Sequence, residues 1–205
     1  MVTPLRDRYP RYYPKTRKEW RRWLTKNHET SSGVWLVNYK KKSGKPRVPY
    51  ADAVEEALCF GWIDSVMNPL DDDSFMQLFT PRKPKSNWSK LNKQRIEKLV
   101  EQGLMVPAGA VKIEAAKRDG TWTMLDAVEA LNVPPDLARA LARNKTALKN
   151  FEAFSPSRKK MLLYWVNEAK RPETRAKRIV EAAAAAKENR DRRPFAGEPK
   201  PKGVK

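Results

Sequence analysis

The spacing of hydrophobic positions divides the chain into an N-terminal part with helices and strands and a C-terminal part with helices alone. Thr16 and Glu19 have the spacing of a capping box. Trp20, Trp23 and Leu24 follow on one face of the helix that this box would begin. A helix is therefore expected from there to about residues 27–28.

Short apolar runs and turn residues predict the next four elements. Val34–Tyr39 is rich in β-branched and aromatic residues, which favours a strand. Gly61 stands where the glycine after a helix C-terminus belongs. The remaining elements are a helix over Tyr50–Phe60 and two strands, Trp62–Leu70 and Ser74–Thr80, joined by a hairpin loop at Asp71–Asp73.

Helical periodicity dominates the rest of the chain. Residues 88–102 carry Leu91, Ile96 and Leu99 on one stripe, with Ser86 or Asn87 as the expected cap. Several later helices begin at a proline, which is tolerated in the first turn. These helices are expected over Pro107–Arg118, Pro135–Arg143, Thr146–Phe154, Pro156–Ala169 and Pro172–Glu188.

These elements predict an α+β fold, with a small antiparallel sheet and helices in the N-terminal part and an all-helical C-terminal module. The expected organisation is a flexible N-terminus over residues 1–15, an α+β domain over 16–105, a helical module over 106–188 and a disordered basic tail over 189–205.

The net charge of the chain indicates which kind of partner it could bind. Lys and Arg number 43 against 24 Asp and Glu, a formal net charge of +19. Such an excess favours an anionic partner, either nucleic acid, an anionic membrane surface or a phosphorylated ligand, although a solvated basic surface is the plain alternative. The single cysteine excludes an intrachain disulfide, and no apolar run is long enough to span a membrane. We expect a cytoplasmic protein.

The reactive side chains do not form a recognisable catalytic set. His28, the only histidine, lies at a predicted helix end, which is typical of a C-terminal turn residue. Cys59 lies on the side of Asp52, Glu55 and Glu56, where nearby carboxylates disfavour the thiolate. Zinc-ligand spacing and glycine-rich phosphate loops are also missing. The sequence therefore predicts binding without catalytic residues, metal or cofactor.

Asp64 is the strongest exception, because the alternation of the strand puts it on the same face as Trp62. It could serve as a desolvated general base or as the ion-pair partner of Arg82 or Lys40, and the ion pair is favoured. An unrecognised enzyme would have its pocket where Trp62, Asp64, Arg82 and Trp88 converge.

Three basic segments are candidates for an anion site. The second segment ends at a predicted helix N-terminus, where free N–H groups favour a phosphate. The third has the spacing of a helix stripe, which could follow a phosphate backbone or project into water while the alanine face packs. The candidates are Lys40, Lys42, Lys45 and Arg47; Arg82, Lys85, Ser86, Asn87 and Ser89 with Trp88; and Arg171, Arg175 and Arg178.

Several separated motifs occur in a fixed order along the chain. They lie at Gly33–Val37 with Lys40, Glu55–Asp64, Phe79–Arg82 with Ser86, Trp88, Ser89 and Asn92, Phe154–Ser157, Ala169–Arg175 and Arg178–Ile179. Together they resemble the YdeI/OmpD-associated family, whose members are also labelled bacteriocin-protection proteins. The resemblance covers about residues 16–188 and implies an α+β N-terminal part, a helical C-terminal module, protection against bacteriocins or antimicrobial peptides, and association with an outer-membrane porin. It implies no reaction and no catalytic residues.

The leading hypothesis is a non-enzymatic bacteriocin- or stress-protection protein that binds an anionic partner. A protein partner is also compatible with this hypothesis. Direct capture of cationic peptides is disfavoured at +19 unless an acidic patch exists, and only Asp71–Asp73 and Asp52/Glu55/Glu56 qualify. The alternatives are a nucleic-acid-binding protein and, less favoured, the enzyme with the Asp64 pocket.

Overall fold

The computed structural model describes residues 4–190 and divides the chain into two compact units, residues 1–124 and 125–205. The boundary follows Met124, so the helix over 107–118 belongs to the first unit, whereas the sequence assigned it to the helical module. The predicted basic tail lies outside the described residues from position 191 onward. None of the helices in residues 4–190 is both long and apolar enough to cross a membrane.

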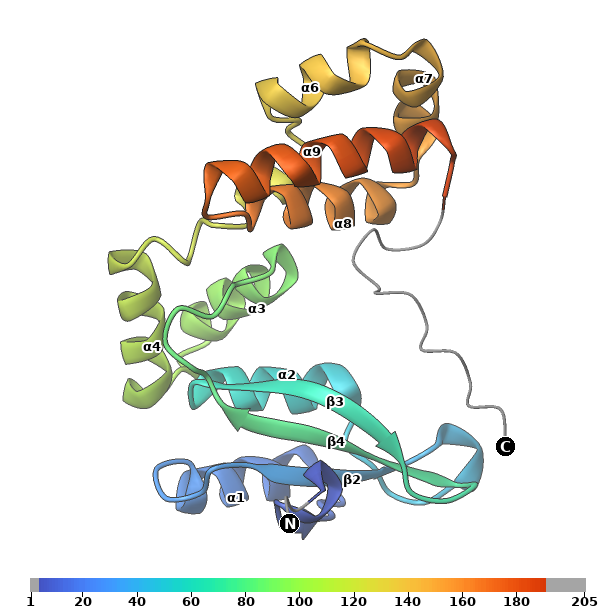
Figure 1. Cartoon of the computed structure of the whole chain (residues 1–205). Coiled ribbons are helices and arrows are strands. Elements are labelled where there is room, and N and C mark those ends of the chain that lie inside the picture. Colours follow the sequence, from blue (N-terminus) through green and yellow to red (C-terminus); the bar gives the residue numbers. More distant parts are fainter. Residues whose placement is uncertain (1–3, 191–205) are drawn as a thin grey trace. The chain divides into compact units, whose positions relative to one another are not determined.

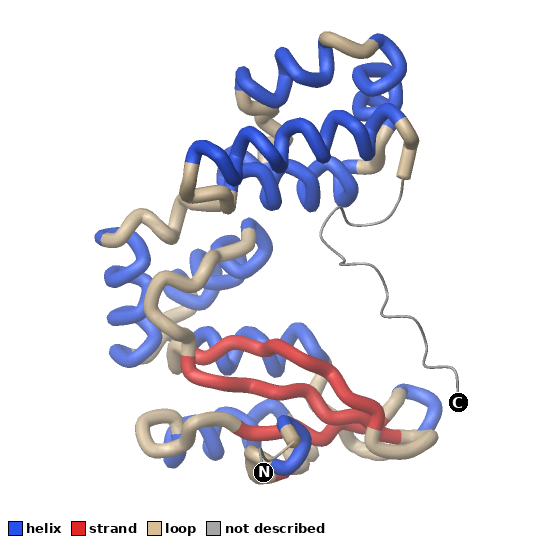
Figure 2. Tube along the Cα trace, in the orientation of Figure 1, coloured by secondary structure: helices blue, strands red, loops and turns tan. Residues whose placement is uncertain are grey.

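The first unit contains a sheet with the strand order β1-β2-β4-β3 (Figure 1). β2 and β4 pair antiparallel, as do β4 and β3, and a register shift interrupts the last pair between Asp64 and Met67. The predicted antiparallel sheet is confirmed for these three strands. Their bounds are β2 Val34–Tyr39, β3 Trp62–Pro69 and β4 Ser74–Pro81 (Figure 2).

The fourth strand lies in the segment that the sequence placed in a flexible N-terminus. β1, Arg11–Tyr12, pairs in parallel with Trp35 and Leu36 of β2, so the sheet is mixed. Two residues are too short to show an alternating pattern, which is why the sequence carries no sign of this strand. Tyr9 packs beside Trp35 on the same side of the sheet.

Helices and short turns complete the first unit. Thr16 accepts a hydrogen bond from the Glu19 N–H, which confirms the cap of α1. Gly61 has φ +72°, the left-handed conformation expected after α2. The elements are the 3-10 turns Leu5–Asp7 and Lys41–Ser43, α1 Arg17–Asn27, α2 Tyr50–Cys59, α3 Lys90–Glu101 and α4 Pro107–Arg118.

One core lies between the sheet and these helices, and aromatic side chains form its centre. Trp20 stacks on Trp23 and packs against Phe79 of β4, while Trp62 meets Trp23 edge-on. Ile96 and Leu99 anchor α3 in this core, but Leu91 is 55% exposed, so the predicted stripe was wrong at that position. The helix begins only at Lys90, and Leu91 lies in its first, solvent-facing turn.

The second unit is helical within the residues described, as predicted. Its core includes Leu137, Leu141, Phe151, Leu163 and Val166. The sequence predicted four of its helices within two residues at each end and missed α5, which is a single turn. The helices are α5 Asp126–Glu129, α6 Pro135–Ala142, α7 Lys145–Ala153, α8 Pro156–Asn167 and α9 Pro172–Lys187.

Candidate anion-binding site

The loop between β4 and α3 forms the candidate site. Two prolines, Pro81 and Pro84, remove backbone donors and end the strand pairing. Lys85 adopts a left-handed backbone at φ 59°, which turns the chain toward α3. Ser89 caps α3 by accepting from the Asn92 N–H, so the predicted cap at Ser86 or Asn87 was wrong.

Ser86 and Asn87 bind Arg82 instead of capping the helix. Nη1 of Arg82 donates to Ser86 Oγ at 3.2 Å and to the Asn87 carbonyl at 3.1 Å. The guanidinium carbon lies 3.6 Å from the centre of the Trp88 ring, which is a cation–π contact. The loop therefore holds the arginine with one hydroxyl, one carbonyl and one indole, all of them without formal charge.

Arg82 is a buried cation without a paired anion. Only 4% of the residue is exposed, and its Nε has no hydrogen-bond acceptor among the residues described. Within residues 4–190 no carboxylate forms an ion pair with it; Asp64 acts on it only through longer-range attraction. Burial lowers the pKa of Arg82 to about 10, against that attraction, so the side chain remains charged at neutral pH. A buried unpaired charge is costly, and a bound anion would offset the cost.

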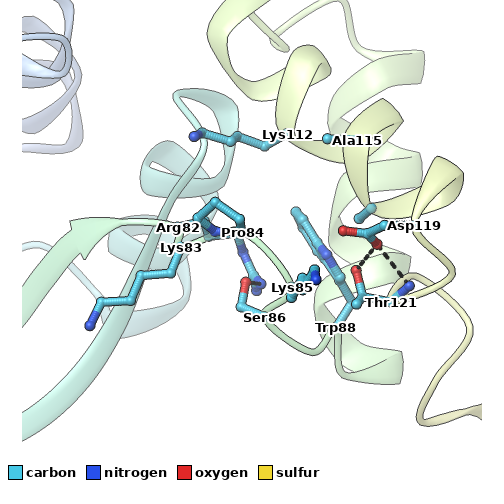
Figure 3. Close-up of a pocket in the computed structure, with 11 residues that line it drawn as sticks. Arg82, Lys83, Pro84, Lys85, Ser86, Trp88, Lys112, Ala115, Asp119 and Thr121 are labelled. Carbon is cyan, nitrogen blue, oxygen red and sulfur yellow. Dashed lines mark hydrogen bonds between the residues drawn. The ribbon is translucent and has the colours of Figure 1, made fainter.

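Arg82 lines a small cavity of about 90 Å³ between this loop and α4 (Figure 3). Its wall includes the apolar side chains of Trp88 and Ala116, which are both buried. Four of the lining residues are basic and one is acidic, which gives the cavity a strongly positive balance. The charged residues are Arg82, Lys83, Lys85, Lys112 and Asp119, and the others include Ser86 and Thr121.

Asp119 is fixed at the C-terminal end of α4. Its Oδ1 accepts from the Thr121 hydroxyl at 2.6 Å and from the Thr121 N–H at 3.0 Å. These bonds lower the pKa of Asp119, with a smaller contribution from Lys85, so the carboxylate is charged at neutral pH. Nothing in the sequence pointed to Lys112, Asp119 and Thr121, because they lie on α4 or just after its end, far along the chain, and form no motif with the loop.

Asp64 and Trp62 do not line this cavity. Asp64 accepts a 2.7 Å hydrogen bond from the Tyr50 hydroxyl, so the direct partner is neither of the two cations expected, Arg82 and Lys40. Desolvation, followed by this bond, raises the pKa of Tyr50 to about 12. Trp62 is buried and donates to the His28 carbonyl at 3.2 Å. It lines a different cavity from Arg82, so the four-residue enzyme pocket is not assembled there.

The first basic segment lies beside the acidic hairpin loop instead. Lys40 donates through Nζ to the Asp72 carbonyl at 3.0 Å, and Lys42 forms a 3.4 Å ion pair with Asp73. Lys45 stands over the Tyr39 ring at 4.4 Å, and Arg47 is exposed. Since local carboxylates and carbonyls engage much of this segment, its capacity for an external anion is reduced.

The acidic cluster on α2 is also engaged. Arg17 binds Asp52, Glu55 and Glu56, and Arg21 binds Glu56. Consequently this cluster does not form the free acidic patch that direct capture of a cationic peptide would need. Cys59 beside it is buried, and desolvation followed by Glu56 raises the pKa of the thiol, as the sequence predicted.

The arginines of the third basic segment, Arg171, Arg175 and Arg178, were predicted as an anion-binding stripe, but two of them make contacts within the second unit. Arg175 forms a bidentate pair with Asp136 of α6, at 2.6 Å and 3.0 Å. Arg178 donates to the Trp165 carbonyl at 2.6 Å and lies over that indole. Arg171 precedes the helix and is exposed. Two of the three arginines therefore neither follow a phosphate backbone nor project freely into water.

Replacing Arg175 by glutamine is expected to weaken the α6–α9 pairing by about 1 kcal/mol, because a half-exposed ion pair contributes little more. Hydrogen exchange of the α6 and α9 amides measures this loss. Arg171→Gln is the matched control and should leave exchange unchanged. Equal exchange in the two variants would refute a structural role for Arg175.

The Arg175 effect also has a pH dependence. The hydrogen bond from Arg175 lowers the pKa of Asp136 below its ordinary value of 3.8. The stabilisation is therefore present above about pH 4 and is lost as the pH falls through the lower folded-state pKa. Wild type and Arg175→Gln should converge in exchange below that point.

Two family models match this chain. Residues 12–112 match a domain of unknown function, DUF8412, which includes the Arg82 loop. Residues 130–189 match the family described as "Bacteriocin-protection, YdeI or OmpD-Associated". No curated protein and no solved structure matches the chain. The family resemblance is thus confirmed for 130–189, while the N-terminal motifs fall in the segment that matches the other model. Residues 130–189 of the second unit are therefore similar to the YdeI/OmpD-associated family.

Proposed function

We propose that the protein is a non-enzymatic protection factor against bacteriocins, antimicrobial peptides or a related stress, and that it acts by binding an anionic partner in the Arg82 cavity. The description of the family matched by residues 130–189 supports the protective role. The charge of +19 supports an anionic partner.

The observation that carries the proposal is the burial of Arg82 without a paired carboxylate among residues 4–190. A protein that needed only a stable loop would gain by placing an apolar side chain there, because an uncompensated buried charge costs free energy. Lys83, Lys85 and Lys112 add positive charge around the same cavity. An anion bound there would complete the hydrogen bonding of the Arg82 guanidinium and offset its desolvation.

Binding of inorganic phosphate, measured by calorimetry and by the rise in melting temperature at low ionic strength, tests the proposal. Arg82→Gln is expected to weaken phosphate binding at least about tenfold, because a charge-assisted contact is lost. Arg47→Gln removes the same charge from an exposed position and should bind as wild type does. Equal weakening by both variants would overturn the proposal in favour of a diffuse charge effect.

A second variant guards against misfolding of Arg82→Gln. Lys85 is exposed and lines the same cavity, so Lys85→Gln should fold normally and still weaken phosphate binding. If neither Lys85→Gln nor a folded Arg82→Gln differs from Arg47→Gln, the cavity is not the site. Survival of bacteria that express each variant, under bacteriocin challenge, then links binding to protection: Arg82→Gln should lose protection and Arg47→Gln should keep it.

A further inference from the structure

The depth of Arg82 restricts which anions can bind to it. Arg82 and Thr121, on two walls of the cavity, are 4% and 3% exposed. The volume of about 90 Å³ is well below the range of about 300–1,000 Å³ that ligand pockets occupy, so the cavity has room for a small anion and not for a large ligand. An anion must therefore enter the cavity to reach the guanidinium, and groups attached to it on two sides would meet the walls.

We infer that the Arg82 cavity selects the terminal phosphate of a phosphomonoester over the internal phosphodiester of a nucleic-acid backbone; this rests on the proposed function. A monoester has one substituent, which can extend toward solvent past the exposed Lys83 and Lys85 while the phosphate enters. An internal phosphodiester has a chain on both sides, and a cavity of about 90 Å³ with Arg82 buried in its wall offers little room for the second chain.

Charge favours the same ligand. A phosphomonoester carries a charge near −2 at neutral pH and three acceptor oxygens, whereas a phosphodiester carries −1. The cavity offers four cationic side chains and one carboxylate, Asp119. Arg82, whose Nε has no acceptor among the residues described, and Ser86 are polar residues of the lining. Four cations against one anion match a dianion better than a monoanion.

Replacing Asp119 tests whether the group bound in the cavity is negatively charged. Its carboxylate opposes any bound anion, and its fixed position keeps that repulsion in the cavity. Asp119→Asn should therefore tighten binding of a phosphomonoester by about threefold at low ionic strength. A change in the opposite direction would mean that the bound group is not an anion at this place.

Two dinucleotides of one sequence, with and without a 5′-phosphate, form the decisive probe pair. Both contain the same internal phosphodiester, so a difference in affinity reports the terminal phosphate alone. The 5′-phosphorylated form is expected to bind at least about tenfold more tightly to wild type, and this advantage should vanish in Arg82→Gln. It should also fall below about pH 6, where the phosphate becomes a monoanion.

Two further measurements distinguish a nucleotide phosphate from a phosphorylated side chain, and loss of selectivity from loss of anion binding. Phosphoserine should share the dependence on Arg82, because the recognised group is the monoester and not a base. Equal affinity for both dinucleotides, with Arg82 still required, would overturn the selectivity and leave anion binding intact. Inorganic phosphate binding that is independent of Arg82 would overturn the proposed function itself.

Discussion

Replacing Glu56 by glutamine is expected to lower the free energy of unfolding of the first unit by about 3 kcal/mol, because two charge-assisted hydrogen bonds are lost. Glu56 is 3% exposed, and its oxygens accept from Arg17 Nε at 2.6 Å and from Arg21 Nη1 at 2.7 Å. Glutamine has the same shape but offers only one acceptor and turns an amide N–H₂ toward a cation. Two arginines then remain near a buried neutral group.

Urea unfolding followed by tryptophan fluorescence measures this loss, and Glu55→Gln is the matched control. Glu55 is half-buried and accepts one bond, from Arg17 Nη1 at 2.9 Å, so its loss should cost less than about 1 kcal/mol. Equal destabilisation of the two variants would show that the buried bonds of Glu56 to Arg17 and Arg21 contribute no more than an exposed ion pair. Phosphate binding to either variant should be unchanged while it is folded.

Replacing Gly109 by alanine is expected to destabilise the first unit by about 3 kcal/mol, although alanine favours a helix. A Cβ at this position would lie 2.3 Å from the carbonyl oxygen of Cys59 and 2.6 Å from Sδ of Met105. The methionine can move, but the Cys59 carbonyl cannot, because it belongs to the last turn of α2 and accepts from the Val106 N–H. Relief of the clash therefore moves α4 away and strains this hydrogen bond.

The unfolding midpoint in urea measures the Gly109→Ala effect. Ala110→Ser is the control, since Ala110 is exposed in the same helix and the change should cost less than about 0.5 kcal/mol. Because α4 supplies Lys112 and Asp119 to the cavity, phosphate binding should weaken in Gly109→Ala even where the protein is folded. Normal stability in Gly109→Ala would show that α4 packs differently from the arrangement described.

The sequence predicted the long elements because each carries its own periodicity. β2 and α4 have the bounds that were predicted, and the cap of α1 follows from the spacing of Thr16 and Glu19. What the sequence could not predict is competition for a side chain. Three of the four residues 86–89 have side chains that suit a helix cap; in the structure Arg82 binds Ser86, and Ser89 caps α3. That contact depends on tertiary structure.

The sequence predicted the loop side of the candidate site but not the side formed by α4, which depends on tertiary structure. Arg82, Lys85, Ser86 and Trp88 are close in sequence, so their basic and aromatic pattern identified the loop. The opposite wall comes from α4, which reaches this place through the close approach of Gly109 to Cys59. Nothing local in residues 107–121 shows that approach. The engagement of Arg175 could not be predicted either, because its partner Asp136 is distant in sequence.

The stacking of Arg82 on Trp88 links the cavity to the fluorescence of a tryptophan. An indole's emission responds to a charge held against its ring, and the guanidinium is 3.6 Å from the centre of this one. Trp88 in turn lies 5.1 Å from Trp122, so an electrostatic change at the guanidinium reaches a coupled pair of chromophores. Anion binding at the cavity should therefore change the tryptophan emission of the wild-type chain, without a dye or a tag.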